Sequence, residues 1–542
     1  MAYNVVQKIR GKYYLYEVTR ADWDPEKKNS VQKRRYIGPC DENGVLEEGR
    51  RRTMSAAVPA EQRLHWSKNL GQYHLLTEIA KGCGLDEDLG AAFGEDAAKD
   101  ILALAIMRIT QPGSLRGTEE CVQATYLREL LNITKSYSSQ RMTEIVRGIG
   151  DDVNARKRYC AGRIKDSEAI IFDTTALFSS SKLYEMLEYG RRYKRTGLPQ
   201  VNMGYVHCVN ADAPVYYKLY PGSINDIVTL VNLIKEVRAM GSGAEHAVLD
   251  RGFYSESNLR VLYAEGFGFT IPLPSGKDLF KSLISRAIDE LDNPENMFRF
   301  HGRTEFCVDM TIDIPFKDVV DVSGNAVGTI RALVYQNNDR RKDEIDTLAM
   351  RIDSVEIEAS MTKWSKDKVS ELFSGRNAEL RTFFETSEGE DGMIVMTRKR
   401  SAISFAMRNA GRMILLTTLT SSPQEVLGTY HLRDSVEKDF ETLKDDMESG
   451  IEYVRDSVSA EGVMFIQFIA TGLRIRMRNL IRNNPRLNRM GIPMILRSLN
   501  LMTVSNVNGT LLMSEVTKKQ REIFEWFGIG LPSVARSEQP SA

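Results

Sequence analysis

Two aspartates in the chain each end a short run of apolar residues. Asp173 follows the run AIIF at 169–172, and Asp250 follows the run AVL at 247–249. A carboxylate at the end of a buried strand is costly to desolvate unless it is paired or binds a metal ion. Its oxygens suit Mg²⁺, and sites that transfer phosphoryl groups often hold two such ions about 4 Å apart. Either aspartate alone could instead form a turn or cap a helix, but two on core strands favour a divalent-cation site.

A third acidic residue lies in a helical segment that also carries a phenol and two basic residues. The spacings between Tyr430, Arg433, Glu437 and Lys444 are three, four and seven residues. At about 100° per residue, all four share an arc of about 60° on one helix expected over 422–447. This face offers Glu437 as a third metal ligand, with Arg433 and Lys444 as phosphate contacts. The alternative is a surface helix with ordinary ion pairs four residues apart.

The segments around the two aspartates alternate between strands and helices. Strands are expected at 168–178, 201–210, 214–222, 244–253 and 267–274, and helices at 224–240 and 255–266. The order is therefore three strands, a helix, a strand, a helix and a strand. This α/β order resembles that of the ribonuclease-H-like fold.

Other segments divide the chain further. Residues 1–60 predict a small β unit with a hairpin turning at DPEKKNS, and 70–165 predict an α-helical module. The α/β core is expected in two parts, 166–274 and 401–500, separated by a β-rich insertion over 275–400 that also carries a helix at 363–375. Residues 501–542 predict a strand followed by a helix.

Three blocks of the sequence resemble the catalytic blocks of insertion-sequence transposases with an Asp-Asp-Glu active site. They are IIFDTTALF, AVLDRGFYS and YHLRDSVEKDFETLK, which occur in the order typical of that family. One subgroup carries the signature Tyr-x2-Arg-x3-Glu-x6-Lys, which Tyr430, Arg433, Glu437 and Lys444 match without a gap. The resemblance runs from the N-terminal hairpin through the tail.

The resemblance implies a set of roles for these residues. Asp173, Asp250 and Glu437 would be catalytic and coordinate two Mg²⁺ ions, with Mn²⁺ as a possible substitute. One ion would activate water, and later a DNA 3′-hydroxyl, while the other stabilises the leaving oxygen. Tyr430, Arg433 and Lys444 would contact the DNA backbone near the cut end. The implied partners are double-stranded DNA, as terminal inverted repeats and target, and a second copy of the chain. The helical module is a further candidate for DNA contact.

The distribution of charge bears on a nucleic-acid partner. The 542 residues contain 73 Lys+Arg and 73 Asp+Glu, and this net charge of zero argues on its face against such a partner. Between Gly462 and Ser514, however, there are seven arginines and no acidic residue. Three of them, Arg474, Arg478 and Arg482, are four residues apart and predict a basic helical stripe that tracks a DNA backbone. Pairing of these arginines with acids elsewhere in the chain is the alternative.

Composition places the chain among ordinary globular proteins. With 42% hydrophobic residues it is not a disordered chain, a disulfide-rich miniprotein or a collagen-like fibre. The six cysteines are scattered without a CxxC pair, and no apolar run approaches about 18 residues. We therefore expect a cytoplasmic protein without a membrane partner. His207, beside Cys208 on an expected strand, is expected to be a core histidine rather than a metal ligand.

The leading hypothesis is a transposase that excises and reinserts its own insertion sequence by Mg²⁺-dependent cleavage and strand transfer. A second hypothesis is a ribonuclease-H-like DNA nuclease that cuts without joining. A third is a DNA-binding derivative that has lost turnover. The three acids argue against the third, because a retired site has no reason to keep them.

Overall fold

The computed structural model describes most of the chain. It covers residues 3–9, 11–24, 29–45, 64–112, 117–179, 184–190, 198–224, 226–314, 316–361, 369–388, 394–443 and 456–534. The chain forms two compact units, which are described separately. One contains Met1–Trp66 and Asn506–Thr510, and the other contains Ser67–Ser505 and Leu511–Ala542.

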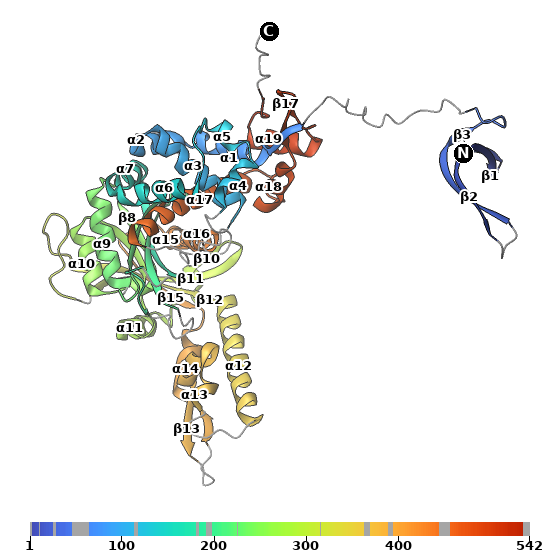
Figure 1. Cartoon of the computed structure of the whole chain (residues 1–542). Coiled ribbons are helices and arrows are strands. Elements are labelled where there is room, and N and C mark those ends of the chain that lie inside the picture. Colours follow the sequence, from blue (N-terminus) through green and yellow to red (C-terminus); the bar gives the residue numbers. More distant parts are fainter. Residues whose placement is uncertain are drawn as a thin grey trace. The chain divides into compact units, whose positions relative to one another are not determined.

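The N-terminal part of the first unit is a three-stranded antiparallel sheet (Figure 1). Its strands, in sheet order, are β1 (Tyr3–Ile9), β2 (Lys12–Asp24) and β3 (Asn29–Cys40). β2 and β3 are the two segments that the sequence pairs in a hairpin, and their register runs from Tyr13 opposite Cys40 to Asp24 opposite Asn29. Residues 25–28 of the expected turn lie outside the described residues. β1 is a third strand that the sequence analysis did not predict.

A nine-stranded mixed sheet forms the centre of the second unit. Its order is β10-β11-β12-β15-β9-β8-β5-β6-β7. The strands are β5 (Ala169–Phe178), β6 (Gln200–Cys208), β7 (Ala213–Pro221), β8 (His246–Leu249), β9 (Gly268–Pro272), β10 (Met297–Phe300), β11 (Arg303–Asp313), β12 (Thr329–Asn337) and β15 (Arg412–Thr417). β8 pairs in parallel with β5 and with β9, and the other pairs are antiparallel. Every residue of β6 and β8 is buried, which is typical of strands covered on both faces.

Helices connect the strands around the two aspartates. They are α9 (Asp226–Ala239), α10 (Glu256–Ala264) and α11 (Asp278–Ala287), with the 3₁₀ turns η1 (Arg251–Phe253) and η2 (Pro294–Asn296). The chain order β5, β6, β7, α9, β8, α10, β9 is the one expected from the sequence. The second unit is thus a mixed α/β structure built on a large mixed sheet.

The N-terminal helices of this unit pack against a long C-terminal helix. The helices are α1 (Gly71–Gly82), α2 (Leu85–Phe93), α3 (Glu95–Thr110), α4 (Thr118–Gln123), α5 (Leu127–Leu130), α6 (Ser139–Asp151), α7 (Val153–Ile164), α17 (Ser457–Arg482), α18 (Ile492–Asn500) and α19 (Lys518–Phe527). α6 and α17 cross so closely that a Cβ on Gly462 would lie 1.9 Å from the carbonyl oxygen of Val146. A Cβ on Gly150 would likewise lie 1.8 Å from the carbonyl oxygen of Val458. These helices therefore share one core with the sheet.

α17 is also long and apolar enough to cross a membrane by length and composition alone. It is the one such helix in the described part of the chain, and 72% of its most apolar stretch is buried inside the protein. This burial is that of a core helix.

Short strands β4 (Leu64–Asn69), β16 (Thr503–Val507) and β17 (Thr510–Met513) form a further small sheet.

The segment between β12 and β15 differs from the expected β-rich insertion. The strands β10, β11 and β12 exist, but they extend the large sheet, because β12 pairs with β15 over Arg331–Gln336. What remains outside the sheet is mainly helical: α12 (Asn338–Met361), α13 (Val369–Leu372), the 3₁₀ helix η3 (Gly375–Phe383) and α14 (Arg400–Asn409), with β13 (Phe384–Glu388) and β14 (Ile394–Arg398). Of the expected helix at 363–375, residues 362–368 lie outside the described residues.

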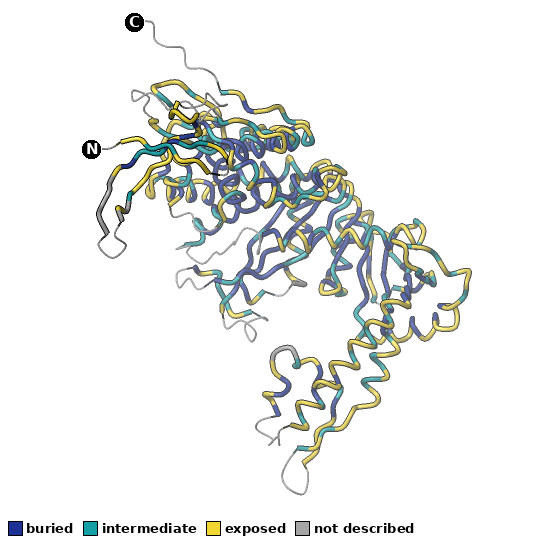
Figure 2. Tube along the Cα trace, turned by 90° about the vertical axis from the view of Figure 1, so that its right-hand side faces the viewer, coloured by how far each residue is buried: buried dark blue, intermediate teal, exposed yellow. Residues whose placement is uncertain are grey.

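This helical insertion, residues 338–411, has a small core of its own. Ile352, Val355 and Leu372 are buried together there, apart from the core of the large sheet. Figure 2 shows that most of its trace is exposed or intermediate, whereas buried residues concentrate in the sheet and the neighbouring helices. The charged sequence of α12 conceals a helical repeat, because Ile345, Leu348, Ile352 and Val355 recur three and four residues apart.

Candidate functional site

The register of two parallel strands brings Asp173 and Asp250 together. Phe172 of β5 is the partner of Leu249 of β8, so the next residues along both strands are the two aspartates. The Oδ1 of Asp173 accepts the backbone N–H of Thr174 at 2.7 Å. The Oδ2 of Asp250 accepts the backbone N–H of Gly252 at 3.3 Å and caps η1. Asp250 thus caps a helical turn, which is the alternative role that the sequence left open. Its Oδ1 takes no part in this cap.

The acidic helix is two helices rather than one. α15 (Pro423–His431) begins at Ser422, whose side chain forms a capping box with Glu425, and α16 spans Asp434–Glu441. Between them the backbone tightens into a 3₁₀-like turn, in which the N–H of Arg433 bonds the carbonyl of Tyr430 at 3.1 Å. The single arc expected for the four signature residues is therefore interrupted at 432–433. Lys444 lies outside the described residues.

The guanidinium of Arg433 joins all three expected carboxylates. Its Nη1 donates to the Oδ1 of Asp250 at 2.9 Å and lies 3.8 Å from the Oδ2 of Asp173. Its Nη2 donates to the Oε1 of Glu437 at 2.6 Å. The structure therefore gathers residues that are separated by up to 264 positions (437 − 173) around one cation. We call these four residues the carboxylate cluster.

The carboxylate cluster carries more negative than positive charge. The side chain of Asp173 is 13% exposed, and burial raises its pKa to about 7. The Thr174 N–H lowers that pKa, the Asp250 charge raises it, the Arg433 charge lowers it and the Glu437 charge raises it. With all three acids ionised, one guanidinium leaves the carboxylate cluster with a formal charge of −2. Burial, the main cause of the shift, disfavours the ionised form of Asp173, and a nearby cation would favour that form.

The ligand chemistry of the carboxylate cluster suits a hard divalent cation. All donors are carboxylate oxygens, the type that Mg²⁺ and Mn²⁺ prefer. In the described part of the chain, no three acidic, histidine or cysteine side chains are grouped closely enough to hold a metal ion as they stand. The Arg433 guanidinium lies among the carboxylates instead. A bound cation would therefore have to take over contacts that Arg433 makes here.

The opposite face of α16 holds a second group of charges. Asp439 is fully buried, and its Oδ2 bonds the Nδ1 of His207 at 2.7 Å and the hydroxyl of Tyr205 at 3.2 Å. Its Oδ1 accepts from Arg478 of α17 at 3.0 Å. We call this group, together with Asp212 and Arg482, the anchoring network. It ties α16 to the large sheet and to α17.

Asp212 completes the anchoring network. It lies 3.3 Å from the Nε2 of His207 and accepts from Arg482 at 2.8 Å. Burial alone would lower the pKa of His207, but the hydrogen bonds to Asp212 and Asp439 outweigh it and raise the pKa. The hydrogen bond from His207 is also the main reason that the pKa of Asp212 falls to about 2. His207 is thus a buried core histidine held between two acids.

The expected basic stripe of α17 is not a continuous exposed surface. Arg474 is only 7% exposed, and Arg478 and Arg482 form the ion pairs with Asp439 and Asp212. This corresponds to the alternative in which the arginines pair with acids elsewhere in the chain. The sequence could not identify these acids, because each pair joins segments far apart in the chain. Exposed arginines do occur nearby, at Arg476, Arg486 and Arg489.

The carboxylate cluster lies within a segment that matches a known family. The family model described as the transposase DDE domain matches residues 169–473, from the first residue of β5 into α17 and more than half of the chain. No curated protein matches the chain. Among solved structures, the cryo-EM structure of the piggyBac transposase synaptic complex with hairpin DNA is similar, at 9% identity. The match covers 75% of this chain and 70% of that chain with a TM-score of 0.37, which is too low to support an argument.

Proposed function

The chain belongs to the family of transposases with a DDE domain, and from this premise we propose that it cuts DNA at insertion-sequence ends and joins the ends to target DNA. The observation that carries the proposal is the convergence of Asp173, Asp250 and Glu437 on Arg433. These acids come from three separate elements of the matched segment. Membership of the matched subgroup with the Tyr-Arg-Glu-Lys signature stays a prediction.

The three carboxylates are proposed to hold two Mg²⁺ ions. Their oxygen donors and their formal charge of −2 with Arg433 support this assignment, because a divalent cation would balance that charge. Bound Mg²⁺ polarises a phosphodiester and lowers the pKa of the attacking water or 3′-hydroxyl. Asp173 lies on β5, Asp250 directly follows β8, and Glu437 lies on a helix that the anchoring network holds. These elements support the three carboxylates that we propose as ligands.

Arg433 is proposed to have two successive partners. Without a divalent cation, its guanidinium neutralises the carboxylates at 2.6–3.8 Å. When cations replace it, the planar guanidinium is released and can pair with phosphate oxygens of the DNA backbone. Tyr430, one turn earlier, and Lys444 are proposed to contact the same backbone. Arg433 would thus link cation binding to DNA binding.

The remaining proposals follow from the family. We propose that the strands from β5 to β9 with α9 and α10 form a ribonuclease-H-like core, which the order of these elements supports. The partner is double-stranded DNA, as terminal inverted repeats and target, bound by a homodimer in the cytoplasm. Arg478 and Arg482 form ion pairs with acids of the chain itself, and these pairs explain the two residues without a DNA contact.

Incubating the full chain with duplexes that carry the element's own ends tests this function. Cleaved and joined products should form with Mg²⁺ and should be absent with a chelator. Glu437→Gln should lower the rate at least about a hundredfold, because it removes a charged ligand.

Asp434→Asn is the matched control. Asp434 lies in the first turn of the same helix with its side chain 59% exposed, and it contacts His431 rather than the carboxylate cluster. It should react like the unchanged chain. Full activity of Glu437→Gln would remove that residue from the site, and cleavage without joined product would favour the nuclease.

A further inference from the structure

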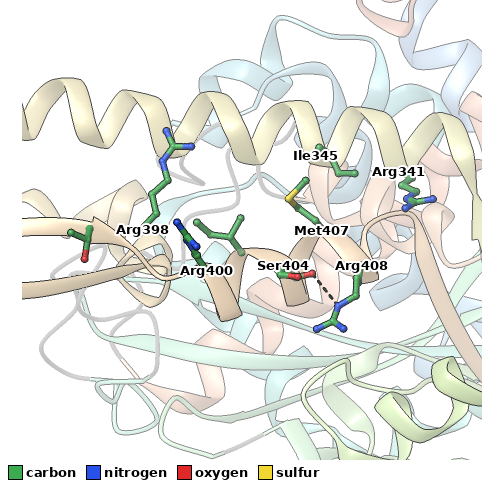
Figure 3. A pocket seen from close by; sticks show the side chains of 9 residues that line it. Arg341, Ile345, Arg398, Arg400, Ser404, Met407 and Arg408 are labelled. Atoms are coloured by element: carbon green, nitrogen blue, oxygen red, sulfur yellow. Dashed lines mark hydrogen bonds between the residues drawn. The ribbon is translucent and has the colours of Figure 1, made fainter.

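The helical insertion contains an open pocket lined by arginines. The pocket has a volume of about 670 Å³ and lies between α12, β14 and α14 (Figure 3). Arg341 of α12, Arg398 of β14, and Arg400 and Arg408 of α14 line it. Apolar side chains, such as Ile345 and Met407, lie between the guanidinium groups. No acidic residue is among the described residues that line the pocket.

Among the described residues, three of the four arginines have no acidic partner. Arg398 is neutralised by Glu356 at 2.6 Å and by Asp353 at 2.7 Å. Within the described ranges, Arg341, Arg400 and Arg408 form no ion pair, and the Nε of Arg408 bonds only the carbonyl of Ser404 at 3.4 Å. The sequence around them is also strongly basic, with five Lys or Arg and no acid from Gly392 to Gln424.

The register of the large sheet places the base of the helical insertion at the edge of the sheet where Asp250 lies. Asp250 follows the end of β8, and Pro272, the end of its parallel neighbour β9, pairs with Leu415, three residues after the start of β15. β15 starts opposite Gln336, near the end of β12. The insertion therefore leaves the sheet at the same edge as Asp250. β12 is three strands away from β8, a lateral distance of about 14 Å.

We infer that the arginine pocket binds the phosphodiester backbone of the DNA whose cleavage is proposed above, at a position beside the cut. Guanidinium groups match phosphate oxygens with paired donors, and the apolar side chains between them suit contact with deoxyribose. The charge of the pocket identifies the ligand class, because it is lined by three arginines that form no ion pair among the described residues. The insertion that holds them leaves the sheet at the edge where Asp250 lies. This inference rests on the proposed function for the source of the phosphate.

Binding of a labelled duplex to the full chain at several salt concentrations tests the pocket. Arg400→Gln should weaken binding about equally for all sequences and reduce the slope of log K against log salt by about one. The triple change of Arg341, Arg400 and Arg408 to Gln should reduce the slope by about three. Arg400→Lys keeps the charge and should keep the slope, which separates lost charge from misfolding.

Arg340→Gln provides the matched control. Arg340 precedes Arg341 on α12, but it pairs with Glu344 at 2.6 Å and does not line the pocket. It should bind DNA like the unchanged chain. Two results would overturn the inference. The first is an unchanged slope of log K against log salt in the triple variant. The second is a triple variant that loses affinity for inorganic phosphate but binds DNA like the unchanged chain.

A cleavage assay separates this inference from the proposed function. Duplexes that extend well beyond the cut should show a larger loss in the triple variant than duplexes that end close to it. If the unchanged chain cuts neither duplex, the proposed function fails. If the triple variant cuts both duplexes as fast as the unchanged chain does, the pocket inference fails while the function stands.

Discussion

Both faces of α16 carry acidic residues, but the two faces differ in how far nearby cations balance those acids. Glu437 and Asp439 are two positions apart and thus about 200° apart around the helix. On the Glu437 face, three carboxylates share the single guanidinium of Arg433. On the Asp439 face, two carboxylates meet His207, Arg478 and Arg482. The carboxylate cluster is short of positive charge, whereas in the anchoring network two guanidinium groups balance the two carboxylates.

The pKa values of two aspartates express this difference. Burial raises the pKa of Asp173 to about 7, whereas the hydrogen bond from His207 helps lower the pKa of Asp212 to about 2. A group of charges that balance one another can serve as a structural network. A group with excess negative charge can bind a further cation. The difference teaches that charge balance, rather than the presence of acids, separates a candidate site from a structural network.

The largest effect is expected from removing the centre of the anchoring network. Asp439→Ala leaves His207 and Arg478 without their shared carboxylate in a buried place. The free energy of unfolding should fall by about 3–5 kcal/mol. Urea denaturation measures it, with Asp434→Ala on the same helix as the exposed control, expected within about 0.5 kcal/mol. A loss below about 1 kcal/mol for Asp439→Ala would show that the network contributes little stability.

A smaller effect is expected when Mg²⁺ is added to the carboxylate cluster. An ion that binds only the folded chain stabilises it by about 2.7 kcal/mol at a hundredfold excess over its Kd. Thermal unfolding with increasing Mg²⁺ should show this gain, and Asp173→Asn should lose most of it. Asp212→Asn, in the anchoring network, should keep it. An equal gain in all three proteins would place the ion elsewhere.

The smallest effect, taken per pH unit, is a pH dependence of stability in the absence of divalent cations. The folded pKa of Asp173, about 7, lies above its ordinary value of 3.8, so the folded chain binds the additional proton between these pH values. Stability from this group is therefore lost as pH rises from about 4 to 7, by at most about 1.4 kcal/mol per pH unit. Asp173→Asn should lack this slope, which comparing the two unfolding curves would reveal.

Asp212 should act with the opposite sign. Its folded pKa of about 2 lies below 3.8, so its contribution is present above about pH 4 and is lost as pH falls toward 2. Because both proteins in the Asp173 comparison contain Asp212 and His207, their contributions cancel in the difference. A flat difference between pH 4 and 7 would contradict the raised pKa of Asp173.

The sequence predicted the parts of the site that local patterns encode. The apolar runs before Asp173 and Asp250 indicate strand ends, and parallel pairing of β5 with β8 then sets these residues side by side. The family inferred from the three blocks is confirmed by the family model. The metal-binding roles of the three acids stay predictions.

Features that depend on distant contacts could not be predicted. The break at 432–433 interrupts a segment with good helix-forming residues on both sides, so the pattern alone favours one helix. The sequence does not distinguish Asp439 from the other acids of its helix, because its partner His207 lies 232 positions earlier. The β-rich insertion expected over 275–400 did not include α12, since the seven acids and four basic residues of this helix obscure the spacing of Ile345, Leu348 and Ile352.

The helical insertion begins and ends at neighbouring positions of the sheet. The N–H of Asn337, the last residue of β12, bonds the carbonyl of Gly411 just before β15 at 2.9 Å. Antiparallel strands at this distance can be joined by a two-residue turn. The whole insertion is thus, in topological terms, the enlarged tip of a β-hairpin. The length and sequence of the insertion can therefore diverge between related chains without a change in the strand order of the sheet. The arginine pocket can change in evolution while the carboxylate cluster stays fixed.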